Sequence, residues 1–64
     1  YDSFIYNGGG LEFTTSSAID SVISLDINGL VEDEGVGFEV SGTYSVKLLG
    51  TPVVGSKVSV VYLS

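Results

Sequence analysis

Apolar and polar residues alternate with a period of two along most of the chain, and glycines interrupt the alternation at short intervals. In the stretch 22–27, Ile23, Leu25 and Ile27 fall on one side and polar residues dominate the other. This period belongs to a β-strand with one buried face, and no stretch carries the 3.6-residue period of a helix. Because nine glycines divide 64 residues into short apolar stretches, the sequence predicts an all-β fold with tight turns.

Six or seven short strands are expected, at spacings of roughly 8–12 residues. This arrangement is typical of a small antiparallel β-sandwich, either immunoglobulin-like or closed into a partly open barrel. A single helical turn is allowed near 17–21, where Ser17 could cap it and Asp20 follows three residues later. The expected strands are 4–6, 11–15, 22–27, 30–34, 37–41, 44–49 and 57–63.

Five residues are expected to define the turns. Asn28-Gly29 is the strongest short-range signal for a two-residue type I′ turn, because both central residues must adopt positive φ. Gly42 is expected to turn the chain tightly between two strands, at 41–43. Pro52 and Gly55 punctuate the loop before the last strand.

The alternation also predicts which side chains form the core, and the predicted core is small. A fold of 64 residues buries only roughly 60% of the surface of the unfolded chain, so support from a neighbouring chain or domain is expected. Cysteine is absent, so no disulfide can supply that support. The predicted core is Phe13, Ile23, Leu25, Ile27, Phe38, Val40, Val46, Leu48, Val58, Val60 and Tyr62.

Composition excludes several classes of function. Eight acidic residues and two lysines give a net charge of −6, which argues against binding nucleic acid or anionic membranes. Histidine and cysteine are both absent, so only oxygen ligands remain for a metal ion. Residues 1–64 are expected to form one domain. Because the chain begins at Tyr1 and contains no methionine, we expect it to be a fragment of a longer protein.

The stretch DINGLVEDEG (26–35) holds four of the eight acidic residues and is a candidate calcium loop. With Gly29 at position six of an EF-hand, Asn28 and Asp26 fall at positions five and three. Position one is then Ser24, and position twelve is Gly35, which has no side chain to coordinate the ion. The EF-hand pattern therefore fails.

A calcium site of another kind could still use Glu32, Asp33 and Glu34, which we call the acidic arm. In an extended strand Glu32 and Glu34 share one face and Asp33 lies on the other, so the three carboxylates would not converge without a bulge. The alternative is a solvated arm whose charge discourages edge-to-edge pairing, or one that meets a basic partner. The favoured interpretation is the solvated arm, without a metal.

No residues in the pattern of an active site were found. The glycines at 8–10 follow a short strand but precede no helix and no basic residue, so a turn explains them better than a phosphate loop. Serines are abundant, but histidine is absent and no lysine is placed to act as their base. We expect no enzyme activity and no cofactor. Tyr1 and Tyr6 could stack on sugar rings, although Phe4 and Tyr6 are more simply core or interface residues.

Several apolar residues fall outside the predicted core and suggest a contact surface. The outward half of the last strand becomes apolar at its end, and further apolar groups lie in and beside the loop that precedes it. Several such residues together favour a protein interface over chance exposure. The predicted interface residues are Leu49, Val53, Val54, Val61 and Leu63.

Once the strands are placed, the order of motifs from 23 to 63 resembles a small β-sandwich module of tailed-bacteriophage tail fibres and other virion structural proteins. That module has an alternating strand ending in Asn-Gly, an aromatic-x-Val-Ser-Gly turn, a further strand, Pro-x-x-Gly, and a closing strand. The acidic arm and the paired valines at 53–54 depart from its usual small polar residues. The matching segments are 11–14, 23–29, 38–42, 46–48, 52–55 and 58–62.

The resemblance implies a non-catalytic structural or attachment role in a virion, such as a tail, fibre or capsid-decoration protein. The expected partners are other virion subunits or flanking domains, with a homo-oligomer as one form. The alternative is a carbohydrate-binding or adhesin-like β-sandwich module of a bacterial surface protein, located at the cell surface or outside the cell. A third reading is a calcium-stabilised extracellular domain.

Overall fold

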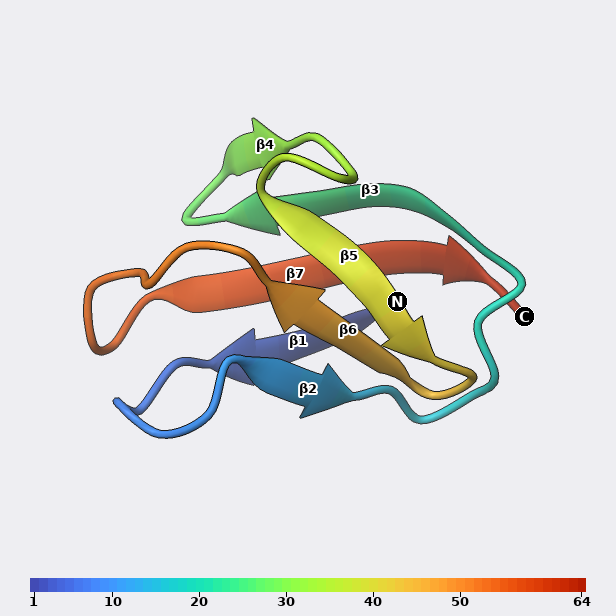
Figure 1. Cartoon of the computed structure of the whole chain (residues 1–64), viewed down its shortest axis with the longest axis horizontal. Coiled ribbons are helices and arrows are strands. Elements are labelled where there is room, and N and C mark those ends of the chain that lie inside the picture. Colours follow the sequence, from blue (N-terminus) through green and yellow to red (C-terminus); the bar gives the residue numbers. More distant parts are fainter.

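The computed structural model describes all 64 residues and confirms the all-β prediction (Figure 1). It contains seven strands and no helix. The strands are β1 (Asp2–Ile5), β2 (Glu12–Thr14), β3 (Ser21–Ile27), β4 (Leu30–Glu32), β5 (Phe38–Gly42), β6 (Ser45–Leu48) and β7 (Lys57–Leu63).

The strands form two antiparallel sheets that stack as a sandwich. The four-stranded sheet has the order β1-β7-β3-β4 and the three-stranded sheet has the order β2-β6-β5. In Figure 1 the three-stranded sheet lies in front of the four-stranded one. This strand order is not the ABED/CFG order of an immunoglobulin constant domain, so the likeness to immunoglobulins is one of architecture.

The core lies between the sheets and comes mainly from their central strands. Val58 and Val60 of β7 face Val46 and Leu48 of β6, with Leu25 of β3 beside them, and all five are at most 1% exposed. At the far edge of the sandwich, Phe4 of β1 stacks on Phe13 of β2, with ring centroids 5.1 Å apart. Of the eleven predicted core residues, six are buried, namely Leu25, Phe38, Val46, Leu48, Val58 and Val60.

A β-bulge in β3 makes the prediction for Ile23 wrong. Val22 pairs with Tyr62, but the next pair joins Ser24 to Val61, so Ile23 is an extra residue in the ladder. A bulge of this kind shifts the alternation by one position. Val22 therefore packs on the core, whereas Ile23 is 61% exposed.

Val40 is the other predicted core residue that the structure leaves exposed. It pairs with Val46 and therefore points toward the inner side of its sheet. However, β5 is an edge strand, so no neighbouring strand covers its open flank and Val40 stays 37% exposed. The remaining predicted core residues, Phe13, Ile27 and Tyr62, are partly buried against the core.

Two turns form as predicted. Asn28 and Gly29 have φ values of 53° and 88°, as a type I′ turn requires. Gly55 has φ 93° in the turn that follows Pro52, and the Ser56 N–H closes this turn on the Val53 carbonyl at 3.0 Å.

The other turn predictions need correction. Gly42 ends β5 as a paired residue, and the chain reverses at Thr43 and Tyr44 rather than around Gly42. The helical turn allowed near 17–21 does not form. Instead the backbone N–H groups of Ile19 and Asp20 donate, each at 2.7 Å, to carbonyls of distant residues, Thr43 and Leu63. These hydrogen bonds between residues distant in the sequence replace the local hydrogen bonds that a helical turn would make.

Candidate functional site

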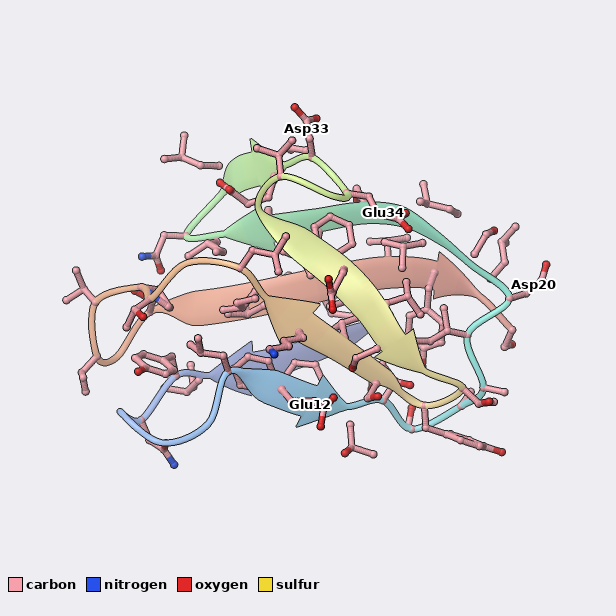
Figure 2. All side chains as sticks on the ribbon, in the orientation of Figure 1. Glu12, Asp20, Asp33 and Glu34 are labelled. Atoms are coloured by element: carbon pink, nitrogen blue, oxygen red, sulfur yellow. The ribbon has the colours of Figure 1, made fainter.

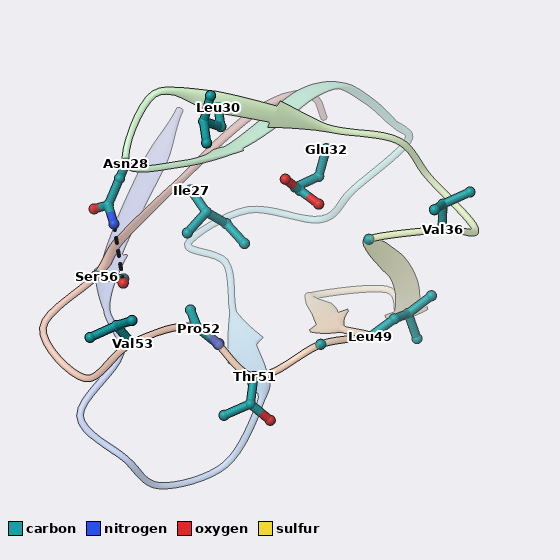
Figure 3. Close-up of a pocket in the computed structure, with 12 residues that line it drawn as sticks. Ile27, Asn28, Leu30, Glu32, Val36, Leu49, Thr51, Pro52, Val53 and Ser56 are labelled. Carbon is teal, nitrogen blue, oxygen red and sulfur yellow. Dashed lines mark hydrogen bonds between the residues drawn. The ribbon is translucent and has the colours of Figure 1, made fainter.

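A groove opens between the two sheets at one end of the sandwich, and we call it the end groove (Figure 3). Its volume is about 450 Å³, within the range of small ligand or side-chain sites. In Figure 1 this end carries the β3–β4 turn and the loop before β7, and both chain termini lie toward the other end. The lining residues are Ile27, Asn28, Leu30, Glu32, Val36, Gly37, Leu49, Gly50, Thr51, Pro52, Val53 and Ser56.

The first wall is the β3–β4 hairpin, which Asn28 ties to the start of β7. Its backbone N–H donates to the Lys57 carbonyl at 2.9 Å, and its Oδ1 accepts the Lys57 N–H at 2.9 Å. Its Nδ2 donates to Ser56 Oγ at 3.1 Å (Figure 3). Asn28 was predicted only to shape a turn, but it also joins the two walls of the groove.

The second wall is the loop between β6 and β7, and backbone hydrogen bonds hold both of its ends. The Leu49 N–H donates to the Gly37 carbonyl at 2.9 Å, which attaches the start of the loop to the turn before β5. At the other end, the Tyr6 N–H donates to the Ser56 carbonyl at 2.9 Å and the Gly55 N–H donates to the Tyr6 carbonyl at 2.7 Å. The loop is therefore anchored without belonging to a strand.

Glu32 places a carboxylate inside the end groove (Figure 3). It pairs with the fully buried Leu25, and directly paired residues point to the same face of a sheet. Glu32 therefore points between the sheets, and it is half-buried. Gly37 makes room for it, because a Cβ at position 37 would overlap its carboxylate and come within 2.8 Å of its Cβ.

Sequence reasoning missed this role of Glu32, although a signal was present. The type I′ turn at Asn28-Gly29 fixes the register of the hairpin, so Ile27 pairs with Leu30 and Leu25 pairs with Glu32. An inward Leu25 then requires an inward Glu32. The prediction of a wholly solvated acidic arm is therefore wrong for this residue.

The rest of the acidic arm is exposed and does not continue the strand. β4 ends at Glu32, and the chain then turns: the Gly37 N–H donates to the Asp33 carbonyl at 2.8 Å. Asp33 and Glu34 project from the surface near this turn, apart from Glu12 and Asp20 (Figure 2). No three acidic side chains come close enough together to hold a metal ion.

The rim of the end groove is apolar and open to solvent. Leu30 is 73% exposed, Val36 77% and Val53 80%. Neither lysine of the chain lines the groove, so Glu32 is its only charged residue. The site therefore combines aliphatic walls with one negative charge.

The predicted interface residues fall into two groups at opposite ends of the molecule. Leu49 and Val53 line the end groove, and Val54 is exposed in the same loop. Val61 and Leu63 lie near the end of β7, on the outer face of the four-stranded sheet. The structure thus brings Leu49 and Val53 together but does not join them to Val61 and Leu63.

The outer faces of the two sheets differ in chemistry. On the four-stranded sheet, Ile23, Val61 and Leu63 are neighbours through the pairs Ser24–Val61 and Ser21–Leu63, and we call these three residues the outer apolar face. On the three-stranded sheet, the corresponding row is Glu12, Lys47 and Glu39, which pair across β2, β6 and β5. The apolar outer surface is therefore confined to one sheet.

The two tyrosines proposed for sugar stacking do not form a common surface. Tyr6 is 5% exposed and belongs to the buried hydrophobic residues, whereas Tyr1 is 70% exposed. Of the two roles expected for Phe4 and Tyr6, core or interface, the structure shows the core: Tyr6 is buried and Phe4 is partly buried against the core. Tyr1 is therefore left without the aromatic partner that the sugar hypothesis used.

A hydrogen-bond network around Asp2 joins the first strand, the 16–17 loop and the last strand. The Asp2 carboxylate accepts the Tyr62 hydroxyl at 2.5 Å, the Ser16 N–H at 3.1 Å and the Ser16 hydroxyl at 3.0 Å. The Tyr62 hydroxyl in turn accepts the Ser17 N–H at 3.2 Å. These donors, with Tyr62 the strongest, lower the pKa of Asp2 below its ordinary value of 3.8.

Comparisons of the chain with protein-family models, curated proteins and solved structures found no match. The structure has no helix of the length and hydrophobicity needed to cross a membrane.

Proposed function

We propose that this chain is a non-catalytic structural module that works by packing against neighbouring protein subunits or domains. The observation that carries the proposal is the unequal distribution of apolar surface. Twelve large hydrophobic residues are exposed, whereas seven hydrophobic residues are buried. Single exposed apolar residues are normal, but a surplus of this size in a small domain favours burial against a partner.

The outer apolar face is the surface best suited to such packing. Ile23 is 61% exposed and Leu63 52%, and Val61 lies between them on the sheet. A paired sheet face is rigid, so its side chains lose little further conformational freedom when a partner covers them. The charged row on the other sheet is suited to remain in solvent.

The motif resemblance supports a proposal for the assembly in which this module packs. A tail, fibre or capsid-decoration protein of a tailed bacteriophage presents many copies of neighbouring subunits, so a small module there can bury its apolar face permanently. The proposed location is the virion. The proposed partners are other virion subunits or flanking domains, including further copies of the same protein. The carbohydrate-binding alternative has no comparable support, because Tyr6 is buried.

The test is to purify tailed particles from the source of this sequence and identify their proteins by mass spectrometry. We expect the chain at a fixed copy number per particle. The variant Leu63→Ser should lower its incorporation without changing the melting temperature of the isolated chain. Tyr44→Ser is the matched control, because Tyr44 is also 52% exposed but lies in the β5–β6 turn. Absence of the chain from particles, or equal incorporation of both variants, would contradict the proposal.

A further inference from the structure

We infer that the end groove binds an arginine or lysine side chain of a partner protein, carried on a segment with aliphatic neighbours. The inference rests on the proposed function and adds to it the chemistry of one contacting segment. Three features of the groove carry it: the aliphatic rim, the single inward carboxylate, and the absence of a cation from the lining.

The groove carries one negative charge that no cation of its lining balances. Glu32 is half-buried between the sheets, where its carboxylate attracts a cation more strongly than a fully solvated carboxylate would. The chain cannot supply that cation to its own groove. Lys47 lies on the outer face of the three-stranded sheet, and Lys57 pairs with Ile5 across β1 and β7. With a net charge of −6, the molecule also attracts a basic partner at long range.

The groove fits a side chain that has an aliphatic stem and a positively charged head. Arginine and lysine carry a charged head on an aliphatic stem, and the stem is buried favourably along apolar surface while the head remains hydrated or paired. In the end groove, Leu30 and Val53 form aliphatic walls, and Glu32 projects between the walls from the inner face of β4 (Figure 3). The stem would contact the walls while the head meets the carboxylate. An acidic or purely aliphatic side chain would satisfy only one part of the site.

The groove is preformed and lies apart from the outer apolar face. Both walls are held in place by backbone hydrogen bonds and by Asn28, so the groove exists before a partner arrives. A preformed site avoids much of the ordering cost of binding. The groove is also separate from the outer apolar face, so both surfaces can be occupied at once. The outer apolar face would supply most of the buried area, and the groove would select the partner by charge.

The test uses an acetylated and amidated five-residue peptide with arginine at its centre and leucine on either side. Its control peptide carries citrulline, which has nearly the same shape as arginine but no charge. The peptides are titrated into the full 64-residue chain labelled with nitrogen-15, and amide shifts are followed by NMR. We expect shifts at Leu30, Glu32 and Leu49 with the arginine peptide, weaker binding of the citrulline peptide, and a loss of affinity at high salt.

Two pairs of variants separate the groove from general effects of charge and hydrophobicity. Glu32→Gln should weaken binding of the arginine peptide by up to about fivefold, the range expected for a partly exposed ion pair. Glu34→Gln removes the same charge outside the groove and should leave the affinity unchanged. Leu30→Ser should weaken binding, whereas Val31→Ser should not, because Val31 is the similarly exposed neighbour on the other face of β4.

The inference is overturned if arginine and citrulline peptides bind equally, or if Glu32→Gln and Glu34→Gln behave alike. It is also overturned if the shifts map to the outer apolar face, or if the groove amides shift with protein concentration alone, which would indicate a second copy of the chain. None of these results would test whether the chain is present in purified particles, so the proposed function would stand. Conversely, peptide binding by a chain that is absent from particles would refute the proposed function alone.

Discussion

The β-bulge in β3 leads to a sharp prediction, because it reverses the roles of two adjacent residues. Simple alternation places Ile23 in the core with Leu25, whereas the structure packs the partly buried Val22 against the core and leaves Ile23 61% exposed. The perturbation is therefore a pair of variants, Val22→Thr and Ile23→Thr. Both keep a β-branched residue in the strand, so differences in strand propensity stay small.

The expected magnitudes follow from burial. Threonine at position 22 brings a hydroxyl against the core, and this should cost about 1–3 kcal/mol of unfolding free energy. Threonine at position 23 stays in solvent and should change stability by less than about 0.5 kcal/mol. As a reference for full burial, Leu25→Ala should cost about 2–5 kcal/mol. A chain of 64 residues is expected to have an unfolding free energy of only about 3–10 kcal/mol, so the reference variant should lose a large share of it.

Urea denaturation measures these differences. The chain has four tyrosines and no tryptophan, so tyrosine fluorescence and far-ultraviolet circular dichroism are the suitable probes. For Val22→Thr the urea concentration at the midpoint of unfolding should fall. The slope of the unfolding free energy against urea concentration should stay constant, because that slope reports the surface exposed on unfolding. If Ile23→Thr loses more stability than Val22→Thr, the bulge is not where the structure places it, and the reasoning is refuted.

The remaining predictions concern acid stability, two glycines and calcium. Because hydrogen bonds lower the pKa of Asp2 in the folded state, the unfolded state binds protons first as the pH falls, and this contribution to stability is lost below the ordinary value of 3.8. Asp2→Asn should therefore show a weaker fall in melting temperature between about pH 5 and about pH 2, and an unchanged profile would contradict the network. Gly29→Ala should cost about 1–2 kcal/mol in urea denaturation, since φ is 88° there; a neutral result would argue against the type I′ turn. Gly37→Ala should cost about 1–3 kcal/mol because the new methyl group displaces Glu32, whereas Gly50→Ala, with nothing within 4 Å of the new Cβ, should cost less, and equal losses would contradict the contact. Calcium or a chelator should leave the melting temperature unchanged, and a rise with calcium would show that the acidic arm binds the ion.

Local rules were sufficient for much of the fold. Period-two alternation and frequent glycines predicted a two-sheet sandwich, because strands with one apolar face must bury that face against another sheet. Asn28-Gly29 predicted its turn, since these two residues adopt positive φ at little cost. The buried hydrophobic residues of β5, β6 and β7 were also predicted, because apolar side chains recur at every second residue in those strands.

The candidate site was predicted only in part. Val53 and Leu49 were recognised as apolar residues outside the core, and the structure places both in the end groove. Leu30, Val36 and Thr51 were not assigned to a site. The groove joins segments 27–32, 36–37 and 49–56, and the distance between such segments depends on how the two sheets stack.

The sequence by itself determined the class of fold, the type I′ turn and most of the core, because each follows from interactions between residues close in the chain or opposite in a hairpin. Only the tertiary structure decided the bulge at Ile23, since an extra residue in a ladder is set by how β3 must fit β7. It also decided that Glu32 faces a groove rather than solvent. The hairpin register determines the side on which Glu32 lies, but the opposite wall is the loop that connects β6 of one sheet to β7 of the other.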